Sequence, residues 1–216
     1  MVKSIANYCY DPSEAVRHIR SVDMGLARYI QVVGEFRLQV NRNRSVFEYL
    51  VRSITYQQLT GKAAATIYNR LRRQFPYGRI SPDQLLSLKM TELRNVGLSR
   101  SKCKALRELA IGVIEGRVPN SAEMHQMLDE EIIRALITIW GVGRWTAEML
   151  LIFYMGRPDI LPAGDLGVRK GYQLVRGHRT LPTFEKLHRA GRRWAPYRSV
   201  ASWYLWRSLE VKISSA

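Results

Sequence analysis

Apolar residues recur with the spacing of helices along most of this chain. The clearest stripe lies between residues 45 and 56 and consists of Val46, Phe47, Leu50, Val51 and Ile54. Residues three or four apart share one face of an α-helix, so this stretch is predicted to be an amphipathic helix. The same spacing predicts further helices over residues 61–75, 102–115, 128–140, 146–155, 166–176 and 197–210. Strand-like alternation is confined to short pieces such as residues 36–40, so the fold class expected is all-α.

Helix starts and breaks divide this pattern. Ser81-Pro82-Asp83 places a capping residue and a proline at the first turn of a helix, and the chain breaks again at residues 95–99. Residues 156–164 hold two prolines and two glycines and are predicted to form a loop, which ends directly at Asp165. No internal repeat or low-complexity tract interrupts the chain, so residues 1–216 are predicted to form a single unit of one or two packed lobes.

A pair of glycines two apart, Gly141 and Gly143, lies between two apolar helical runs. This spacing predicts a tight turn between antiparallel helices, because glycine permits positive φ and close approach of the backbone. The second helix then opens with backbone N–H groups that lack helical partners, so a phosphate can bind there. Arg144 adds a positive charge beside this helix end. A purely structural turn is the alternative interpretation.

The charge of the chain points to a polyanionic partner. Lys and Arg number 34 against 18 Asp and Glu, a formal net charge of +16 that is spread along the sequence. The basic residues are interleaved with 5 Trp and 11 Tyr, which suits nucleic acid, where phosphates meet the charge and bases stack on the rings. A basic surface that is merely solvated is the alternative. The 46% of hydrophobic residues in 216 is enough for a packed core.

Membrane and metal functions are not expected from the sequence. No run reaches the eighteen or so apolar residues of a membrane span, and residues 1–20 carry charges where a signal peptide needs an apolar core. The protein is therefore expected to be soluble and intracellular, in the compartment that holds DNA. Cys9 and Cys103 are too few and too far apart for a disulfide framework, a zinc site or an iron–sulfur cluster, and both are interpreted as reduced thiols.

The hairpin, Trp145, the Pro/Gly-rich loop and Asp165 together resemble the helix-hairpin-helix (HhH-GPD) DNA glycosylases. Within that superfamily, residues 143–149 (GRWTAEM) and 162–171 (PAGDLGVRKG) look most like the alkylation-repair branch, the 3-methyladenine DNA glycosylase II or AlkA/Mag type. The likeness extends upstream to residues 53–59 (SITYQQL) and 62–64, so it covers roughly residues 45–210. The resemblance implies a two-lobed fold with the active-site cleft between the lobes. The lobes are expected to be residues 1–45 with 161–216, and a six-helix lobe of residues 46–160 that contains the hairpin.

The resemblance implies hydrolysis of the N-glycosidic bond between an alkylated purine and deoxyribose, after the base has been flipped out of the duplex. Asp165 matches the family's catalytic carboxylate, which stabilises an oxocarbenium-like sugar or assists the attacking water. An ordinary helix N-cap is the alternative role of Asp165, and the two roles are compatible. Trp145 stands where the bifunctional branch carries a lysine nucleophile, so a monofunctional enzyme that leaves an abasic site is expected.

The resemblance also implies further site residues. The pocket for the flipped base is expected to comprise Trp145, Trp206, Tyr56 and Gln57, since aromatic faces attract the positive ring of an alkylated purine. DNA phosphate is expected to contact the hairpin residues Gly141, Val142, Gly143, Arg144 and Thr146. The residues expected to fill the gap in the duplex or probe its minor groove are Leu98, Arg100, which a gapless alignment favours, and Thr60. No cofactor is required, although the carbonyls of Ile137, Ile139 and Val142 are placed to hold a monovalent cation.

Two positions depart from the family pattern. Trp140 stands where the family frequently has proline, and Gly164 stands where an acidic residue commonly precedes the catalytic one. The expected partner is double-stranded DNA that contains damaged bases, and the protein is expected to act as a monomer. Two alternatives stay open at this point: a catalytically weak or silent helix-hairpin-helix module that only binds DNA, and a glycosylase for other purine lesions.

Overall fold

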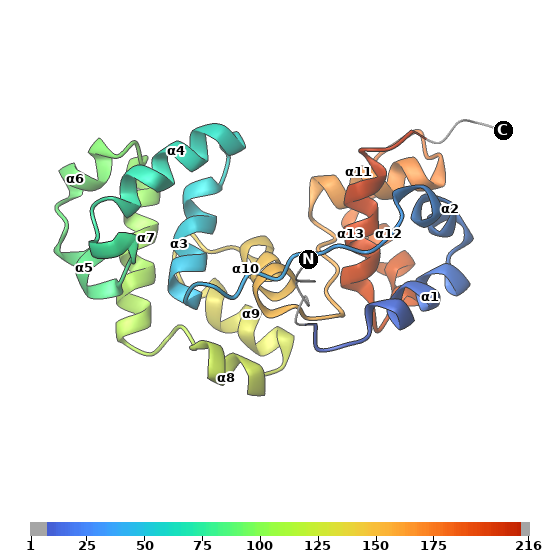
Figure 1. Cartoon of the computed structure of the whole chain (residues 1–216), viewed down its shortest axis with the longest axis horizontal. Coiled ribbons are helices and arrows are strands. Elements are labelled where there is room, and N and C mark those ends of the chain that lie inside the picture. Colours follow the sequence, from blue (N-terminus) through green and yellow to red (C-terminus); the bar gives the residue numbers. More distant parts are fainter. Residues whose placement is uncertain (1–7, 213–216) are drawn as a thin grey trace, which may run out of the picture. The chain divides into compact units, whose positions relative to one another are not determined.

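The computed structural model of this chain describes residues 8–212. In that range the chain forms helices joined by turns and loops, without a β-strand (Figure 1). The predicted all-α fold class is therefore confirmed. None of the helices between residues 8 and 212 is both long enough and apolar enough to cross a lipid bilayer.

The chain divides into two compact units. Of the described residues, the first unit, which we call the terminal unit, contains residues 8–40 and 151–212, and the second, the central unit, contains Asn41–Leu150. The sequence-based lobes had their limits after residues 45 and 160 instead. The second limit coincides with the point where the hairpin's second helix changes from α-helical to π-helical geometry, at Leu151.

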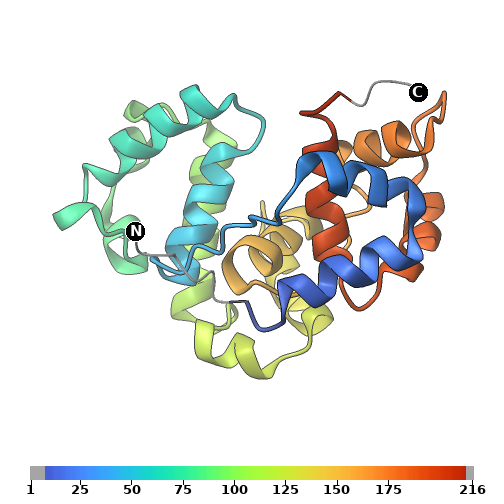
Figure 2. The ribbon, with the colours of Figure 1, turned by 45° about the vertical axis from the view of Figure 1, so that its right-hand side comes forward.

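The terminal unit is built around α13. This helix is buried along most of its length and packs against α11, α2 and α1, as Figure 2 shows for the red α13 and the blue α1 and α2. Because α13 is covered on most sides, the large residues Trp203, Tyr204 and Leu205 can follow one another along it and all be buried. The elements of this unit are α1 (Pro12–Val22), α2 (Met24–Val33), η2 (Leu151–Met155), α11 (Leu166–Arg176), α12 (Phe184–Ala190), η3 (Gly191–Trp194) and α13 (Arg198–Ser208).

The central unit is built around α7, which packs against α5, α3 and α6. The helical hairpin of α9 and α10 packs against this group through the contact of α10 with α3. Its elements are α3 (Val46–Tyr56), α4 (Gly61–Arg72), η1 (Pro76–Gly78), α5 (Pro82–Ser87), α6 (Met90–Asn95), α7 (Arg100–Ile114), α8 (Ser121–Gln126), α9 (Asp129–Ile137) and α10 (Arg144–Leu150).

Several predicted elements differ from the observed ones. The alternation at residues 36–40 reflects an extended segment without a strand partner, in which Phe36 and Leu38 are buried while Arg37 and Gln39 face solvent. The helix expected over residues 128–140 ends at Ile137, because the hairpin turn needs the following residues. Five helices of the described range, α1, α2, α6, α8 and α12, were not predicted individually, and the one helix expected between Ser81 and residue 95 is divided into α5 and α6.

Candidate active site

The predicted helical hairpin is present in the central unit, where α9 and α10 lie side by side (Figure 1). The turn between them is closed by a hydrogen bond from Val142 N–H to the Ile139 carbonyl at 3.0 Å. The second helix begins with a bond from Ala147 N–H to the Gly143 carbonyl at 3.2 Å. The N–H groups of residues 144–146 precede that of Ala147, the first to donate to a helical carbonyl, so they are the groups that an anion would meet at this helix end.

The structure requires glycine at only one of the two hairpin positions. Gly141 has φ of +89°, and a Cβ there would come within 2.5 Å of the Ala105 Cβ on α7. Any side chain at position 141 would therefore push the turn away from α7. Gly143 has ordinary φ and nothing within 4 Å of its Cβ position, so the expectation that the fold needs glycine at both positions is wrong for Gly143. Open space at Gly143 instead leaves the backbone accessible from outside.

Arg144 and Thr146, both expected at phosphate, have partners inside the protein. The Arg144 guanidinium bonds both carboxylate oxygens of Glu130 on α9, and its Nε lies 3.1 Å from Glu148 Oε1. The hydrogen bond to Glu130 raises the pKa of Arg144, and Arg144 in turn lowers the pKa of Glu130. The Thr146 side chain is buried and accepts a bond from Gln57 Nε2 at 3.3 Å. Arg144 thus ties α10 to α9 within the hairpin, and Thr146 ties the hairpin to the end of α3.

The residues expected around a flipped base fall into both units. Trp145, Tyr56 and Gln57 belong to the central unit, and Trp206 belongs to the terminal unit. Trp145 lies on the first turn of α10 and is 45% exposed. Tyr56 carries the Arg52 guanidinium over its ring at 4.1 Å. Gln57 bonds the Gly141 carbonyl at 3.2 Å as well as Thr146, so its amide acts on the hairpin.

Asp165 is the N-cap of α11 and also accepts a hydrogen bond from a tryptophan. Its Oδ1 accepts from Val168 N–H at 2.8 Å, which is the expected capping bond, and from the indole Nε1–H of Trp206 at 2.8 Å. Two donors on one oxygen fix the plane of the carboxylate. The Asp165 side chain is half-buried, so it remains within reach of solvent and of a bound molecule.

Two glycines that the sequence analysis did not single out bring Trp206 to Asp165. Gly167 and Gly171 are four residues apart and share the face of α11 that packs on α13. A Cβ at Gly171 would come within 2.0 Å of the Leu205 carbonyl oxygen, and a Cβ at Gly167 within 2.8 Å of the Trp206 ring. Only glycine permits this approach of α11 to α13, which places the Trp206 indole beside the helix end that Asp165 caps.

An open pocket of about 750 Å³ lies in the terminal unit, and Trp206 is one of the residues that line it. Its aromatic walls are Phe153, Trp203 and Trp206, and its rim carries the charged residues Glu35, Arg37, Arg207 and Glu210. The Phe153 ring lies 5.5 Å from that of Trp206, with a tilt of 31°. Phe153 belongs to the π-helical turn η2, a local geometry that is frequent at functional sites. Sequence reasoning missed Phe153 because its apolar spacing matched a helix core.

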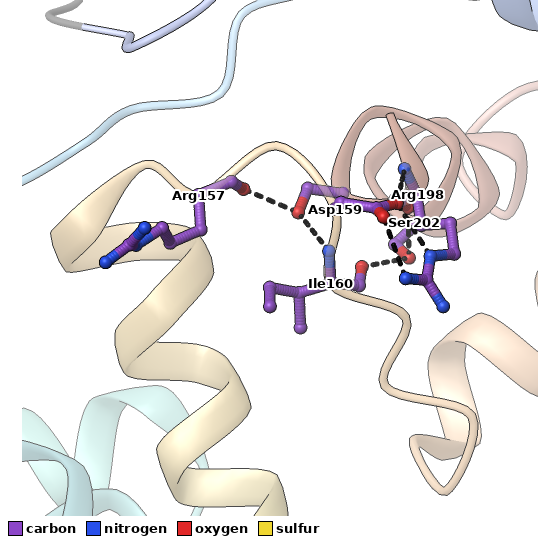
Figure 3. Close-up of polar contacts among 6 residues, drawn as sticks. Arg157, Asp159, Ile160, Arg198 and Ser202 are labelled. Carbon is purple, nitrogen blue, oxygen red and sulfur yellow. Dashed lines mark hydrogen bonds and ion pairs between the residues drawn. The ribbon is translucent and has the colours of Figure 1, made fainter. Parts of the chain in front are cut away.

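The Pro/Gly-rich loop that leads to Asp165 is held by the first turn of α13. Arg198 makes a bidentate ion pair with Asp159, with distances of 2.6 and 2.7 Å, and Ser202 Oγ donates to the Ile160 carbonyl (Figure 3). Ser199 Oγ donates to the Arg157 carbonyl at 2.7 Å and accepts from Ile160 N–H at 3.0 Å. Therefore α13 fixes the loop at its start and the Asp165 carboxylate near its end.

The expected wedge residues are placed differently from one another. Leu98 is 2% exposed in the core of the central unit, so its assignment as a wedge is corrected: it would have to leave that core to enter a duplex. Arg100 is exposed at the start of α7. Thr60 is exposed as the N-cap of α4, and its hydroxyl makes no capping bond. The neighbouring Leu59 is 40% exposed and is the apolar side chain that the structure offers at this turn.

The hairpin carbonyls have compatible chemistry for a monovalent cation. The Ile139 carbonyl already accepts the Val142 N–H, but a carbonyl oxygen has two lone pairs and can accept a second partner. Among residues 8–212, no three His, Cys, Asp or Glu side chains are grouped as ligands of a metal ion. Cys9 and Cys103 are both free thiols, and burial raises the pKa of Cys103.

Solved structures of DNA glycosylases share this fold. The chain is similar to 3-methyladenine DNA glycosylase (Mag1) from Schizosaccharomyces pombe in complex with abasic DNA, with a TM-score of 0.84, 34% identity, and coverage of 92% of this chain and 97% of that one. It is also similar to a DNA-3-methyladenine glycosidase from Bacillus halodurans, with a TM-score of 0.80, 34% identity, and coverage of 90% and 88%. The fold and the hairpin thus define a helix-hairpin-helix glycosylase.

The family follows from the sequence comparisons. Residues 51–196 match the family described as HhH-GPD superfamily base excision DNA repair protein. The curated DNA-3-methyladenine glycosylase 1 of Schizosaccharomyces pombe is 34% identical over 209 residues, which cover 92% of this chain and 88% of that protein. A DNA-3-methyladenine glycosylase of Saccharomyces cerevisiae is 27% identical, with coverage of 95% and 82%. This chain belongs to the HhH-GPD superfamily of base excision DNA repair proteins.

Proposed function

We propose that this protein is a monofunctional DNA glycosylase that hydrolyses the N-glycosidic bond of alkylated purines in double-stranded DNA and leaves an abasic site. The observation that carries the proposal is the Asp165–Trp206 hydrogen bond, which ties a carboxylate to one aromatic wall of an open pocket. The similarity to enzymes named DNA-3-methyladenine glycosylase supports the substrate class. Its place of action is accordingly wherever the cell keeps its DNA.

The geometry at Asp165 suits glycosidic hydrolysis. When the bond to the base breaks, positive charge develops on the sugar ring, and a fixed carboxylate lowers the energy of that state. Val168 N–H and the Trp206 indole hold the Asp165 carboxylate, so it does not reorient during the reaction. The same carboxylate can orient or deprotonate the attacking water. Water takes the place of the base on C1′, and the free base is the leaving group.

The aromatic pocket suits a base with positive charge on its ring. Phe153 and Trp206 present stacking surfaces, and a cationic purine gains cation–π attraction that a normal base lacks. Alkylation also weakens the glycosidic bond, so selection by stacking and charge is sufficient. We assign the base pocket to Phe153, Trp203 and Trp206 within the terminal unit.

A hydrolytic enzyme without lyase activity is proposed because Trp145 has no amine. A lyase forms a Schiff base between a lysine and C1′ of the sugar, and the indole cannot form that adduct. Borohydride reduction should therefore fail to link the protein to DNA, and the product strand should break only on treatment with alkali. Trapping of a covalent complex would contradict this part of the proposal.

The test of the substrate class is base release by the wild-type protein from duplexes that contain 3-methyladenine, 7-methylguanine, ethenoadenine or hypoxanthine. We expect release of the positively charged bases 3-methyladenine and 7-methylguanine ahead of the neutral ones. Release of hypoxanthine alone would favour a glycosylase for other lesions. Release of no base, together with tight duplex binding, would favour a binding module.

Exchanging Trp206 for phenylalanine should separate stacking from carboxylate positioning. Trp206→Phe keeps an aromatic wall but removes the N–H that bonds Asp165, and hydrogen bonds to charged groups contribute about 1.5–3 kcal/mol. We expect the single-turnover excision rate to fall about 10- to 100-fold. Trp203→Phe is the matched control, because Trp203 lines the same pocket without bonding Asp165. Equal losses in both variants would argue against a positioning role.

Alanine substitutions at the two hairpin glycines should separate effects on stability from effects on DNA binding. Gly143→Ala meets no atom of the protein, so its melting temperature should stay near that of the wild type while duplex affinity falls by about tenfold, because a methyl group then occupies the phosphate's place. Gly141→Ala should lower the melting temperature, because its Cβ meets Ala105 and its φ is positive. Unchanged affinity in Gly143→Ala would contradict the assignment of phosphate to the hairpin.

If the hairpin carbonyls hold a monovalent cation, the affinity for duplex DNA should depend on whether K⁺ or Na⁺ is present when the ionic strength is kept constant.

A further inference from the structure

The turn between α3 and α4, residues 57–60, is anchored by a lysine from α7. Lys102 Nζ donates to the Thr55 carbonyl and to the Gln57 carbonyl, both at 2.7 Å. These carbonyls belong to the last turn of α3, where the helix can no longer supply N–H partners. Lys102 is half-buried, and the loss of solvation lowers its pKa. Its ammonium group is thus committed to the end of a helix.

The anchored turn is also hydrogen-bonded to the glycine hairpin. The Gln57 backbone is held by Lys102, and its side-chain amide donates to the Gly141 carbonyl at 3.2 Å and to Thr146 Oγ1 at 3.3 Å. Gln57 therefore links α7, through Lys102, to residues on both sides of the Gly143 position of the hairpin. We call Lys102, Gln57 and these contacts the brace.

Beyond Gln57 the turn is strained and exposed. Gln58 has φ of +56°, which residues other than glycine rarely adopt and which persists only where surrounding contacts hold it. Leu59 and Thr60 follow with exposed side chains, and the Thr60 hydroxyl makes no hydrogen bond that caps α4. Loops that a rigid scaffold holds in place often carry binding residues, and this turn presents an apolar and a polar side chain to solvent next to the hairpin.

We propose that Lys102 is a positioning residue that locks the 57–60 turn and the glycine hairpin into one preformed DNA-binding surface without contacting phosphate itself. The proposal rests on the DNA-binding function proposed above. A preformed surface binds more tightly because fewer groups must be immobilised on association. Loss of the brace should therefore weaken DNA binding although every phosphate contact stays available.

The chain offers a matched control on the same helix. Arg107 of α7 donates from Nη1 to the Leu86 and Leu88 carbonyls at 3.2 and 3.1 Å, so it holds the link between α5 and α6 in the same manner. Arg107→Met and Lys102→Met each remove one positive charge and two bonds to backbone carbonyls. Only Lys102→Met releases the turn that is joined to the hairpin.

The experiment measures the affinity of both variants for an undamaged duplex over a range of salt concentrations. We expect Lys102→Met to bind about tenfold more weakly, the loss expected when one or two extra side chains must be ordered, and Arg107→Met to bind within twofold of the wild type. The slope of log affinity against log salt should be unchanged in Lys102→Met. A slope smaller by about one would show that Lys102 itself meets a phosphate and would overturn the proposal.

Two further measurements keep the test decisive. If Lys102→Met does not fold, Gln57→Met removes the same link at its hairpin end and should show the same loss of affinity with the same salt slope. Single-turnover excision by Lys102→Met at saturating protein should be close to wild type, because the Asp165 carboxylate is untouched. Equal affinity of wild type, Lys102→Met and Gln57→Met would overturn the brace, whereas failure of the wild type itself to bind or excise would overturn the proposed function instead.

Discussion

Replacing Asp165 by asparagine is expected to reduce excision of alkylated purines by about 100- to 1,000-fold, the range seen when one preorganised electrostatic group is removed from a transition state. Asparagine keeps an oxygen that can accept the bonds from Val168 N–H and the Trp206 indole, and it caps helices as well as aspartate does. The fold should therefore survive, while the negative charge beside the sugar is lost. Single-turnover release of 3-methyladenine from methylated duplex DNA measures the effect.

Duplex binding and a second aspartate provide the controls for Asp165→Asn. Binding to undamaged DNA should be retained, since the hairpin is unchanged. Asp11 is also an N-cap in the terminal unit and accepts from Ser13 N–H at 2.8 Å, so Asp11→Asn is the matched replacement. It should leave the excision rate unchanged. Excision that survives in Asp165→Asn at the wild-type rate would mean that Asp165 is only a helix cap.

Replacing Gly171 by alanine is expected to have the largest effect on stability. The new Cβ would lie 2.0 Å from the Leu205 carbonyl oxygen, and this backbone atom can move only if α11 and α13 separate. Overpacking of this kind costs up to about 3 kcal/mol or more, against about 1 kcal/mol gained from alanine's helix propensity. A net loss of about 2 kcal/mol should lower the melting temperature by roughly 4–8 °C.

Separation of these helices should also reach the active site. Trp206 lies on α13 and bonds Asp165 at the end of α11, so Gly171→Ala should slow excision even at temperatures where the protein stays folded. Gly61→Ala is the control, because Gly61 is a helical glycine with no atom within 4 Å of its Cβ position. It should match or exceed the wild-type melting temperature. A stable Gly171→Ala protein would contradict the packing described for α11 and α13.

The sequence predicts best those helices and turns whose ends are marked by a capping residue or a glycine. Helix α11 was predicted with its observed limits because Asp165 caps one end and Gly177, in the left-handed conformation, ends the other. The glycine hairpin was predicted for the same reason. Such signals act over a few residues, so they can be interpreted without knowledge of the rest of the fold.

The parts that could not be predicted depend on contacts between distant residues. The aromatic pocket combines residues 33–39 with Phe153 and Trp206, which no local pattern connects. Burial of Leu98 is decided by packing in the central unit, although its Gly-containing turn resembles an exposed loop. Arg144 was predicted at phosphate, but Glu130, fourteen residues earlier, pairs with it across the hairpin.

Some missed features did have a signal in the sequence. Gly167 and Gly171 are four residues apart in a predicted helix, and glycines on one helix face are typical of close helix packing. Glu148 lies four residues after Arg144, a spacing at which opposite charges pair on a helix. Both patterns would have indicated that this part of the site is held by the protein's own contacts.

Glycosidic hydrolysis at Asp165 is tested most directly by identifying the products that form when the wild-type protein reacts with duplex DNA that carries 3-methyladenine. We expect a time-dependent release of the free base, with strands that remain intact until alkali cleaves them at the abasic site. Absence of free base under conditions where the protein binds the duplex would contradict the central claim that the Asp165 site breaks the glycosidic bond of an alkylated purine.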